Sequence, residues 1–361
     1  EVQYFTTSAF QQKVEAAGAR FRDYGPRLYR FLQSFRPTGD HPFYTLMEYI
    51  LRMDAVTVSI VLEQTAGEGF DYVIHDAMLG GGNIIARKLN LPAVCTCTSF
   101  AMVKPPLPPR MLERGFHPQL DCVLDEMERT AGGWDLEALS IMDVLFKKES
   151  LNIVFTSRLL QPDDGEFDDS FRFIGPSIAP RDNAADFPLD GPGKCLYISM
   201  GTINNDCAAF YRSCMEAFTD LRVILSVGDK VDIASLGPAP DNFTIRNYVP
   251  QIEVLKHVDA CMCHGGLNSV SEALYHGVPV ISIPQTNDQP IVTKRIVETG
   301  AGIGLKMEAV TPDVLRGAVE RLLSDEGYRT ASERVRQSFI EAGGYRAGTE
   351  YIIERIGASC R

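Results

Sequence analysis

The sequence predicts an α/β fold built from two doubly wound parallel sheets, one in each half of the chain. Short β-branched and apolar runs alternate with longer helical runs, which is the pattern of βαβ units. Many strand candidates are continuous apolar runs rather than alternating ones, as expected for parallel strands buried on both faces. With 361 residues, the chain is long enough for two domains with separate cores.

The first half contains five strand candidates, and helical runs lie between them. The helical runs include residues 8–17, 43–65 and 80–89. The expected strands are EVQYFTT (1–7), DYVIHD (71–76), PAVCTCT (92–98), LNIVFTS (151–157) and RFIGPS (172–177).

The second half repeats this rhythm after a proline-rich segment. Residues 178–193 show little apolar periodicity and are the expected linker, which separates a first domain (1–177) from a second (194–343) and a closing helix (344–361). Ligands of such open sheets bind at the carboxyl ends of the strands. The expected strands are 194–202, 222–228, 243–249, 260–266, 278–284 and 302–307, and the helices lie near 206–219, 251–257, 267–276, 288–299, 311–324 and 328–342.

Composition excludes several classes of partner. The chain has 35 basic and 47 acidic residues and a net charge of −12, which argues against nucleic acid as a ligand. No basic run indicates a membrane surface, and no apolar run approaches the roughly 18 residues that span a bilayer. The nine cysteines include Cys95/Cys97 and Cys261/Cys263 in strand-like runs, where i and i+2 share a face. They are expected to be core side chains in a reducing, cytoplasmic protein.

The strongest functional signal is HGGLNSVSEALYHGVPVISIPQTNDQP, residues 264–290. It follows a predicted strand that ends at Cys263, and Gly265-Gly266 predict a tight turn that lets the backbone approach a ligand. A helix is expected to begin near Leu267. Its unpaired amides and its dipole favour an anion such as a diphosphate, with His264 beside it.

Further polar side chains follow on the same helix and after the next strand. Glu272 stands at i+4 from Asn268 and i+3 from Ser269, so the three share a helix face. A carboxylate only accepts hydrogen bonds, so Glu272 is suited to the two hydroxyls of a ribose. Asp288 and Gln289 are placed to bind sugar hydroxyls. Alone, each would indicate only another βαβ unit, but four polar positions at one sheet edge favour a binding site.

This stretch resembles, over its whole length, the donor-binding signature of UDP-dependent glycosyltransferases of family 1, and it is most similar to the bacterial macrolide glycosyltransferase group. The similarity extends along the chain through ISMGT (198–202), SVG (226–228) and NYVPQIEVL (247–255). It implies a GT-B fold, in which two Rossmann-like domains face each other across a cleft. The first domain would bind the acceptor and the second the nucleotide-sugar donor, with no metal ion and no other cofactor.

The resemblance also implies a role for each matching position. Val249 and Gln251, with Pro250 between them, would pack on the uracil, and Ser226 would lie near the nucleotide. Ser199, Gly201 and Thr202 would lie near the donor phosphates, although the two hydroxyls are equally explained as ordinary strand-end residues. His264 and the amides around Gly266, Asn268 and Ser269 would hold the diphosphate, Glu272 the ribose, and Asp288 with Gln289 the transferred sugar.

The same resemblance shows what the first half does not contain. Inverting transfer needs a base that removes the proton of the acceptor hydroxyl. In the family this base is a His in a G-H-x-N-P type motif after the first strand, and the motif does not occur here. The first strand and helix are therefore expected to be absent from this sequence, with about 30 or more residues upstream in the natural protein. A truncated, inactive chain and complementation by another polypeptide are the alternatives.

Asp76 ends the predicted strand 71–76, and the resemblance implies that it orients the catalytic His. The alternative is that Asp76 caps the helix that begins near Gly80. Ser99 and Phe100 follow the next strand and are expected to line the acceptor pocket. The Met- and Pro-rich run 101–112 is either an acceptor loop or a plain surface loop.

Together these patterns predict a UDP-dependent hexosyltransferase that transfers a sugar to a hydroxyl of a hydrophobic small molecule, such as a macrolide, polyketide or flavonoid. The Asp288-Gln289 pair favours glucose. A catalytically silent UDP-sugar-binding protein and a GT-B nucleotide-sugar epimerase are the alternatives. A dinucleotide oxidoreductase is disfavoured, because GAGIG (300–304) precedes a strand and LGGGN (79–83) lacks the required spacing. The sequence leaves the oligomeric state and the acceptor open.

Overall fold

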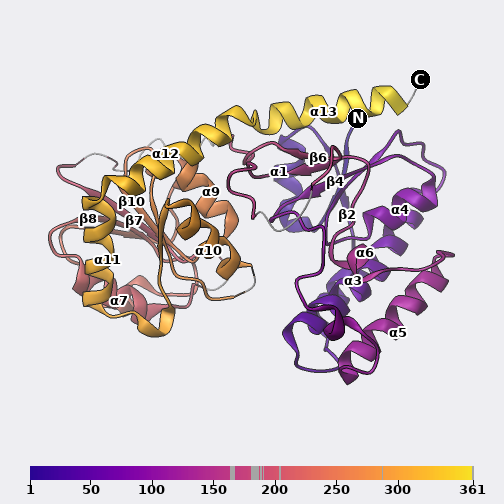
Figure 1. Cartoon of the computed structure of the whole chain (residues 1–361), viewed down its shortest axis with the longest axis horizontal. Helices are drawn as coiled ribbons and strands as arrows, with labels where there is room; N and C mark the ends of the chain where they lie inside the picture. Colours follow the sequence, from indigo (N-terminus) through magenta and orange to yellow (C-terminus); the bar gives the residue numbers. More distant parts are fainter. Residues whose placement is uncertain are drawn as a thin grey trace. The chain divides into compact units, whose positions relative to one another are not determined.

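The computed structural model describes residues 1–162, 167–179, 187, 189, 191–202, 205–286 and 288–359. The chain forms two compact units, which are drawn in Figure 1. Unit 1 comprises Glu1–Val154, Asp164–Arg172 and Thr349–Arg361, and unit 2 comprises Phe155–Asp163 and Phe173–Gly348. The predicted linker, 178–193, lies largely outside the described residues.

The units divide differently from the predicted ranges around residue 155. Residues 155–163 and 173–177, expected in the first domain, belong to unit 2. The reason is a set of contacts with the helices of unit 2. Ser157 Oγ lies 2.8 Å from Ser338 Oγ, and the Arg295 guanidinium donates to the carbonyls of Leu159 (2.7 Å) and Leu160 (3.1 Å).

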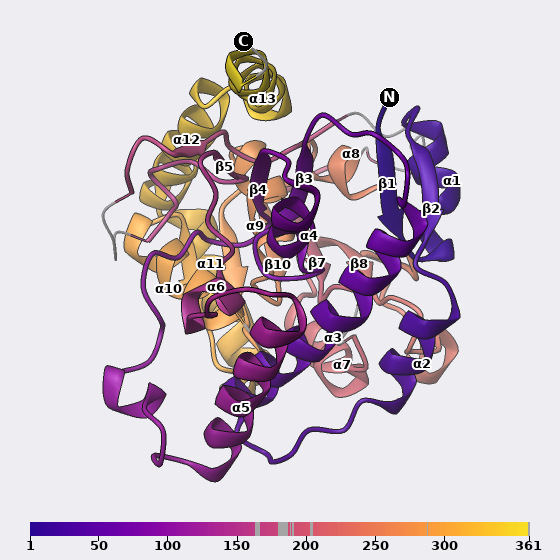
Figure 2. The ribbon, with the colours of Figure 1, turned by 90° about the vertical axis from the view of Figure 1, so that its right-hand side faces the viewer.

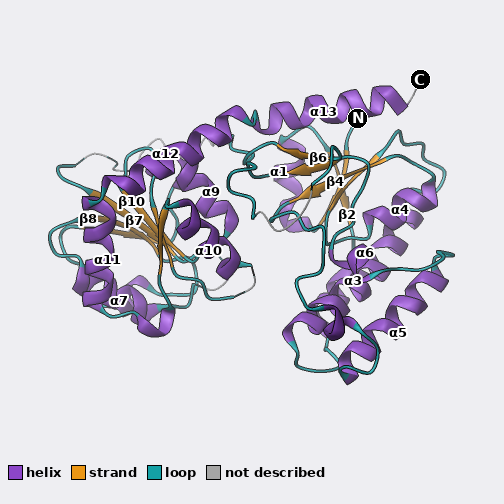
Figure 3. Ribbon diagram, viewed as in Figure 1, coloured by secondary structure: helices purple, strands orange, loops and turns teal. Residues whose placement is uncertain are grey.

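Unit 2 is a parallel six-stranded sheet with helices on both faces (Figure 3). Its strand order is β12-β11-β10-β7-β8-β9, the doubly wound order in which the chain reverses direction across the sheet between β7 and β10. The strands are β7 (Cys195–Ser199), β8 (Arg222–Ser226), β9 (Phe243–Arg246), β10 (Ala260–Cys263), β11 (Val280–Ser282) and β12 (Gly302–Gly304). Each lies inside its predicted range.

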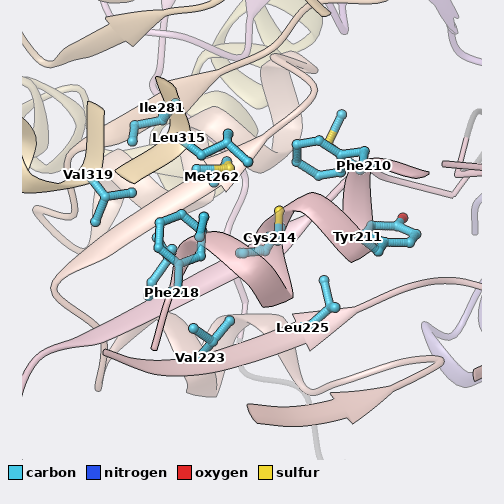
Figure 4. Packing of buried hydrophobic residues seen from close by; sticks show 14 of the residues in the cluster. Phe210, Tyr211, Cys214, Phe218, Val223, Leu225, Met262, Ile281, Leu315 and Val319 are labelled. Carbon is cyan, nitrogen blue, oxygen red and sulfur yellow. The ribbon is translucent and has the colours of Figure 1, made fainter. Parts of the chain in front are cut away.

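Alternate residues of these strands enter two different layers. Leu196, Ile198 and Met262 belong to the core that also contains Phe210 and Leu315, from the helices α7 (Ala208–Ala217) and α11 (Pro312–Ser324). Figure 4 shows Met262, Phe210 and Leu315 in this core. On the other face, α9 packs on β10 and β11 and is in turn contacted by α12. The helices of this layer are α8 (Gln251–Leu255), α9 (Leu267–Tyr275), α10 (Gln289–Thr299) and α12 (Glu326–Glu341). The closing helix α13 (Gly344–Ser359) begins in unit 2 and continues into unit 1.

Unit 1 contains two separate sheets (Figure 2). In one, β1 (Gln3–Thr6) pairs in parallel with β2 (Arg20–Asp23); the other has the order β3-β4-β5-β6. The strands of the second sheet are β3 (Val73–Asp76), β4 (Ala93–Cys97), β5 (Asn152–Val154) and β6 (Phe171–Phe173). On β1 and β3, Tyr4 and Ile74 are about half exposed. The upstream strand that the resemblance implies stays a prediction.

Helices pack around the sheets of unit 1, and the longest, α3, contributes buried residues to several hydrophobic clusters. Tyr44, Met47, Ile50 and Leu51 of α3 pack on Leu120 and Val123 of α5. The helices are α1 (Gln11–Ala16), α2 (Pro26–Ser34), α3 (Pro42–Gln64), α4 (Gly82–Leu89), α5 (Pro118–Gly133) and α6 (Ile141–Leu145), and short 3₁₀ turns in the two units lie at Ser8–Phe10, Pro109–Leu112, Ile233–Leu236 and Met307–Ala309.

The structure agrees with the expected core role of the C-x-C cysteines. Cys95, Cys97, Cys261 and Cys263 are each at most 1% exposed and carry free thiols. Within the described residues, no helix is both long enough and apolar enough to cross a membrane.

Candidate functional site

The polar residues predicted in the second half gather at one edge of the unit 2 sheet. β7 and β10 are neighbours, and Ser199 is paired with Cys263 at their carboxyl ends. The loops that follow these strands therefore start side by side at the point where the strand order reverses. In doubly wound sheets this is the place where ligands bind.

His264 is held between two glycines of these loops. A Cβ on Gly201 would lie 2.6 Å from His264 Cε1, and a Cβ on Gly266 would lie 2.5 Å from His264 Nε2. Gly201 also has φ of +83°, a conformation that favours glycine. Both glycines are therefore needed for the imidazole to occupy this position, and Asn205, which the sequence reasoning missed, donates to the Gly201 carbonyl at 3.0 Å.

Burial controls the charge of this imidazole. Burial lowers the pKa of His264, and the Asp288 carboxylate and the Ser199 backbone oppose the shift. Its Nδ1 atom is buried and has no hydrogen-bond partner among the described residues. Because the usual pKa of histidine is about 6.5, the ring is neutral at pH 7.

The amino end of α9 opens directly after this histidine. Gly266 is its N-cap, and no side chain caps the helix. The first amides of the helix, including those of Asn268 and Ser269, therefore lack an intrahelical or side-chain acceptor. Asn268 is exposed and Ser269 half-buried. The helix end and His264 together form an anion-binding arrangement.

Glu272 lies one turn further along α9 and is connected to two other elements. The residue is only 9% exposed, and its Oε2 accepts a 2.5 Å hydrogen bond from Gln251 Nε2 in α8. Gln251 Oε1 in turn accepts from the Tyr197 hydroxyl of β7 at 2.8 Å. The sequence predicted a base-packing role for Gln251 and Val249. The structure directs the Gln251 side chain inward, while Val249 is half-buried just before α8.

Asp288 and Gln289, which were predicted to bind the transferred sugar, lie in two different environments. Gln289 is 7% exposed, and its Oε1 accepts from the amides of Gln285 (2.8 Å) and Thr286 (3.1 Å). The side-chain carbonyl of Gln289 therefore holds the loop before α10 in place through these two hydrogen bonds. Asp288 is the half-buried N-cap residue of α10 and lies close enough to His264 to influence its titration.

The remaining predicted donor residues are strand-end hydroxyls. Ser226 is 7% exposed and donates to the Asn247 carbonyl at 3.1 Å, which ties β8 to the loop after β9. Ser199 Oγ accepts from the Gly201 amide at 3.4 Å. Thr202 is exposed. Ser199 and Ser226 thus have structural contacts of their own.

In unit 1, Asp76 stands at the carboxyl end of β3 and accepts three hydrogen bonds. Its Oδ1 accepts from the amides of Met78 (2.8 Å) and Leu79 (3.0 Å), and its Oδ2 accepts from Thr98 Oγ1 at 2.9 Å. It does not cap α4, because that helix begins at Gly82 with Gly81 as its N-cap. The capping alternative is therefore wrong in detail, although Asp76 does organise the turn before the helix.

The residue before Asp76 and the predicted acceptor-lining pair have different surroundings. His75 is buried, with Nδ1 2.9 Å from the Asp76 carbonyl and Nε2 3.3 Å from Glu149 Oε1. It therefore faces away from the Asp76 carboxylate, as the strand alternation predicts. Ser99 and Phe100, the predicted acceptor-lining pair, are half-buried in the segment after β4.

A buried ion pair that the sequence reasoning missed supports the loop after Asp76. Lys147 Nζ lies 3.2 Å from Asp54 Oδ2, and these side chains are 0% and 5% exposed. Lys147 also donates to the carbonyls of Met78 and Val144, and its amide donates to the Ala77 carbonyl at 2.8 Å. Lys147 precedes a second lysine in an ordinary charged run, so no sequence signal marked it.

Comparisons with known proteins agree with this arrangement. Residues 215–343 match the family described as erythromycin biosynthesis protein CIII-like, C-terminal domain. The chain is 31% identical to the protein named "Uncharacterized UDP-glucosyltransferase YojK" of Bacillus subtilis (strain 168), over 98% of this chain and 90% of that protein. It is 32% identical to the NDP-glycosyltransferase YjiC of the same organism, over 95% of this chain and 87% of that protein.

A solved structure is similar to the whole chain. The calicheamicin glycosyltransferase CalG4 superposes with a TM-score of 0.84 at 26% identity, covering 99% of this chain and 91% of that one. Such relatives establish both the two-domain GT-B architecture and the class of enzyme. The chain therefore belongs to the UDP-glycosyltransferases of family 1 and is a glycosyltransferase of the macrolide and natural-product type.

Proposed function

We propose that this glycosyltransferase moves glucose from UDP-glucose to a hydroxyl of a hydrophobic small molecule, in one inverting displacement that needs no metal ion. The observation that best supports the binding of a UDP-sugar donor is the position of His264, which is held between Gly201 and Gly266 at the uncapped amino end of α9. The family description, which refers to erythromycin biosynthesis, and the calicheamicin glycosyltransferase support a natural-product acceptor.

The diphosphate is proposed to bind at this helix end. Negative charge builds up on UDP as the bond to the sugar breaks, and the helix amides and an imidazolium at His264 would stabilise it. These groups could replace the divalent cation that other transferases use, which is the basis for proposing metal independence. Ser199, Thr202, Asn268 and Ser269 are further proposed contacts of the phosphates.

The rest of the donor is proposed to extend from this point along the sheet edge. Glu272 would accept from the ribose hydroxyls, and the segment of Val249 and Gln251 would lie against the uracil, with Ser226 nearby. Asp288 and the amide nitrogen of Gln289 would bind the transferred glucose. The free cysteines of the described chain support a reducing, cytosolic location.

The acceptor half is proposed to lie in unit 1 around the carboxyl ends of β3 and β4. Asp76, fixed by three hydrogen bonds, would orient and charge-stabilise a histidine base that removes the acceptor's proton. Ser99 and Phe100 would contact the acceptor. Sequencing the gene on the 5′ side of the Glu1 codon tests the base: an in-frame G-H-x-N-P type segment there supports it, and the absence of one contradicts it.

A turnover assay with UDP-glucose and a phenolic acceptor tests the function as a whole, on the protein translated from its whole gene. Formation of a glycoside together with UDP is the expected result. Tight binding of UDP without turnover would instead show a silent binding protein, and an epimerised UDP-sugar would show an epimerase. Retained activity in the presence of a chelator tests metal independence, and inversion at the anomeric carbon, seen by NMR, tests the inverting mechanism.

Donor binding is expected to take up a proton through His264. The imidazole is neutral in the free protein because burial lowers the pKa of His264, and a bound diphosphate should raise that pKa by charge attraction. The dissociation constant of UDP-glucose should then increase as pH rises through the bound-state pKa of His264, by at most about tenfold per pH unit. Calorimetry at pH 6 to 8, in two buffers that differ in ionisation enthalpy, measures this uptake.

UDP-glucose is the appropriate probe because its diphosphate diester does not titrate in this range, unlike UDP. A His264→Asn variant should bind more weakly and without proton uptake. The matched control is His276→Asn, because burial lowers the pKa of His276 as well but that residue lies at the opposite end of α9. If His276→Asn abolishes the uptake and His264→Asn does not, the assignment is wrong.

A further inference from the structure

Tyr197 is a polar side chain in the middle of a buried sheet. It lies in β7, the strand at the centre of the strand reversal, and is only 2% exposed. Burial raises the pKa of the Tyr197 hydroxyl, so the group keeps its proton and must donate it. A buried hydroxyl without a partner costs free energy, and this one finds its acceptor in Gln251 Oε1 at 2.8 Å.

The chemistry of the three groups fixes the direction of the hydrogen bonds. The Glu272 carboxylate only accepts, so Gln251 must turn its Nε2 toward Glu272 Oε2, which lies 2.5 Å away. Gln251 Oε1 then points to Tyr197 and needs a donor. The reverse orientation of the amide would place its oxygen against a carboxylate. Donation therefore runs in one direction, from Tyr197 to Gln251 to Glu272.

The three residues come from three separate elements. Tyr197 belongs to β7, Gln251 is the first residue of α8, and Glu272 belongs to the second turn of α9. The sheet and two helices are thus joined at the carboxylate that the proposed function assigns to the ribose. A carboxylate with a fixed orientation discriminates between ligands better than a mobile one, because it cannot turn to another partner when a ligand hydroxyl is missing.

We propose that Tyr197 is a positioning residue that makes the donor site select ribonucleoside over 2′-deoxyribonucleoside diphosphates, by locking the Gln251 amide and, through it, the Glu272 carboxylate. This inference rests on the proposed binding of a nucleoside diphosphate at the edge of the unit 2 sheet. In this proposal Tyr197 acts through Gln251 and Glu272 and not by contact with the nucleotide.

The test compares UDP with 2′-deoxy-UDP, two ligands that differ by one hydroxyl, by calorimetry on the wild-type protein and on Tyr197→Phe. The wild type should prefer UDP by at least about tenfold, the effect of one hydrogen bond to a charged group. Tyr197→Phe should bind UDP about fivefold or more weakly and 2′-deoxy-UDP within about twofold of the wild type. The preference should therefore shrink.

Tyr211→Phe is the matched control. Tyr211 is a second fully buried tyrosine of the same unit, and its hydroxyl lies 3.3 Å from the Asn205 carbonyl and 3.5 Å from the Val227 carbonyl, both backbone groups. Its removal should leave the preference for UDP unchanged. Gln251→Met, which keeps the length of the side chain but cannot donate to Glu272, should reproduce the loss seen with Tyr197→Phe and serves if that variant does not fold.

The outcomes separate the inference from the function on which it rests. A wild-type protein that binds neither ligand contradicts the proposed function. Wild-type binding of UDP without preference over 2′-deoxy-UDP overturns the inference alone. An equal weakening of both ligands in Tyr197→Phe and Gln251→Met also overturns it, since that result indicates only a general packing role.

Discussion

Replacement of Asp76 by Asn is expected to lower kcat by about 10²- to 10⁴-fold, the range found for the removal of a group that orients a catalytic base. The substitution keeps the size of the side chain and an oxygen that accepts from the Met78 and Leu79 amides. It removes the negative charge and replaces the Oδ2 atom that accepts from Thr98. The binding of UDP should not change. Steady-state kinetics on the whole gene product, together with calorimetry of UDP binding, measure both effects.

Thr98→Val is the matched control for this prediction. It removes one of the three donors to Asp76 and leaves the carboxylate and both amide contacts in place. Its effect on kcat should be less than about tenfold, as for the loss of one hydrogen bond. If Asp76→Asn instead retains kcat within about threefold of the wild type, Asp76 is only a structural turn residue and the catalytic assignment fails.

Replacement of Lys147 by Met is expected to destabilise unit 1 by about 3–5 kcal/mol, the usual cost of breaking a buried ion pair. The reason is that Asp54, 5% exposed, would be left as a buried carboxylate without its counter-charge. The Met78 and Val144 carbonyls would also lose their donor. Urea denaturation followed by a spectroscopic probe in unit 1 measures the free energy of unfolding of that unit.

Two further variants make this result specific. Lys148→Met alters the adjacent lysine, whose partner Asp168 is exposed, and should leave the unfolding midpoint nearly unchanged. The double variant Asp54→Leu with Lys147→Met removes both charges and should recover much of the stability lost in Lys147→Met. A Lys147→Met protein as stable as Lys148→Met would falsify the buried-pair argument.

The elements of unit 2 were predictable because most of its strands are short, largely apolar runs bounded by a turn residue. β7, for example, is CLYIS followed by Met-Gly, and β10 is ACMC followed by His-Gly-Gly. β2 was missed because Arg20-Phe21-Arg22-Asp23 has a single apolar residue among three charged ones, which does not resemble a buried strand. α4 begins two residues later than predicted, because Gly81 adopts the left-handed conformation at φ of +62°.

Part of the candidate site was also predictable. His264, Gly266 and Glu272 lie within nine residues of one another, so local spacing along one turn and one helix was sufficient to indicate their shared edge. Tyr197 and Lys147 could not be found in this way. Tyr197 is separated by 54 residues from Gln251, so local spacing does not connect the two. Tyr197 stands among the residues of an apolar strand, and Lys147 stands beside another lysine, so nothing in the local sequence marks either of them.

The sequence by itself therefore determined the fold class, the family and the local anion-binding turn, because these depend on periodicity and on residues close together in the chain. Only the tertiary structure decided how the candidate residues are held. It turned the Gln251 side chain toward Glu272, directed the side-chain carbonyl of Gln289 to the backbone of the loop before α10, and placed Lys147 against Asp54. These contacts depend on which helices pack on which strands, and a buried polar group takes whichever partner that packing brings within reach.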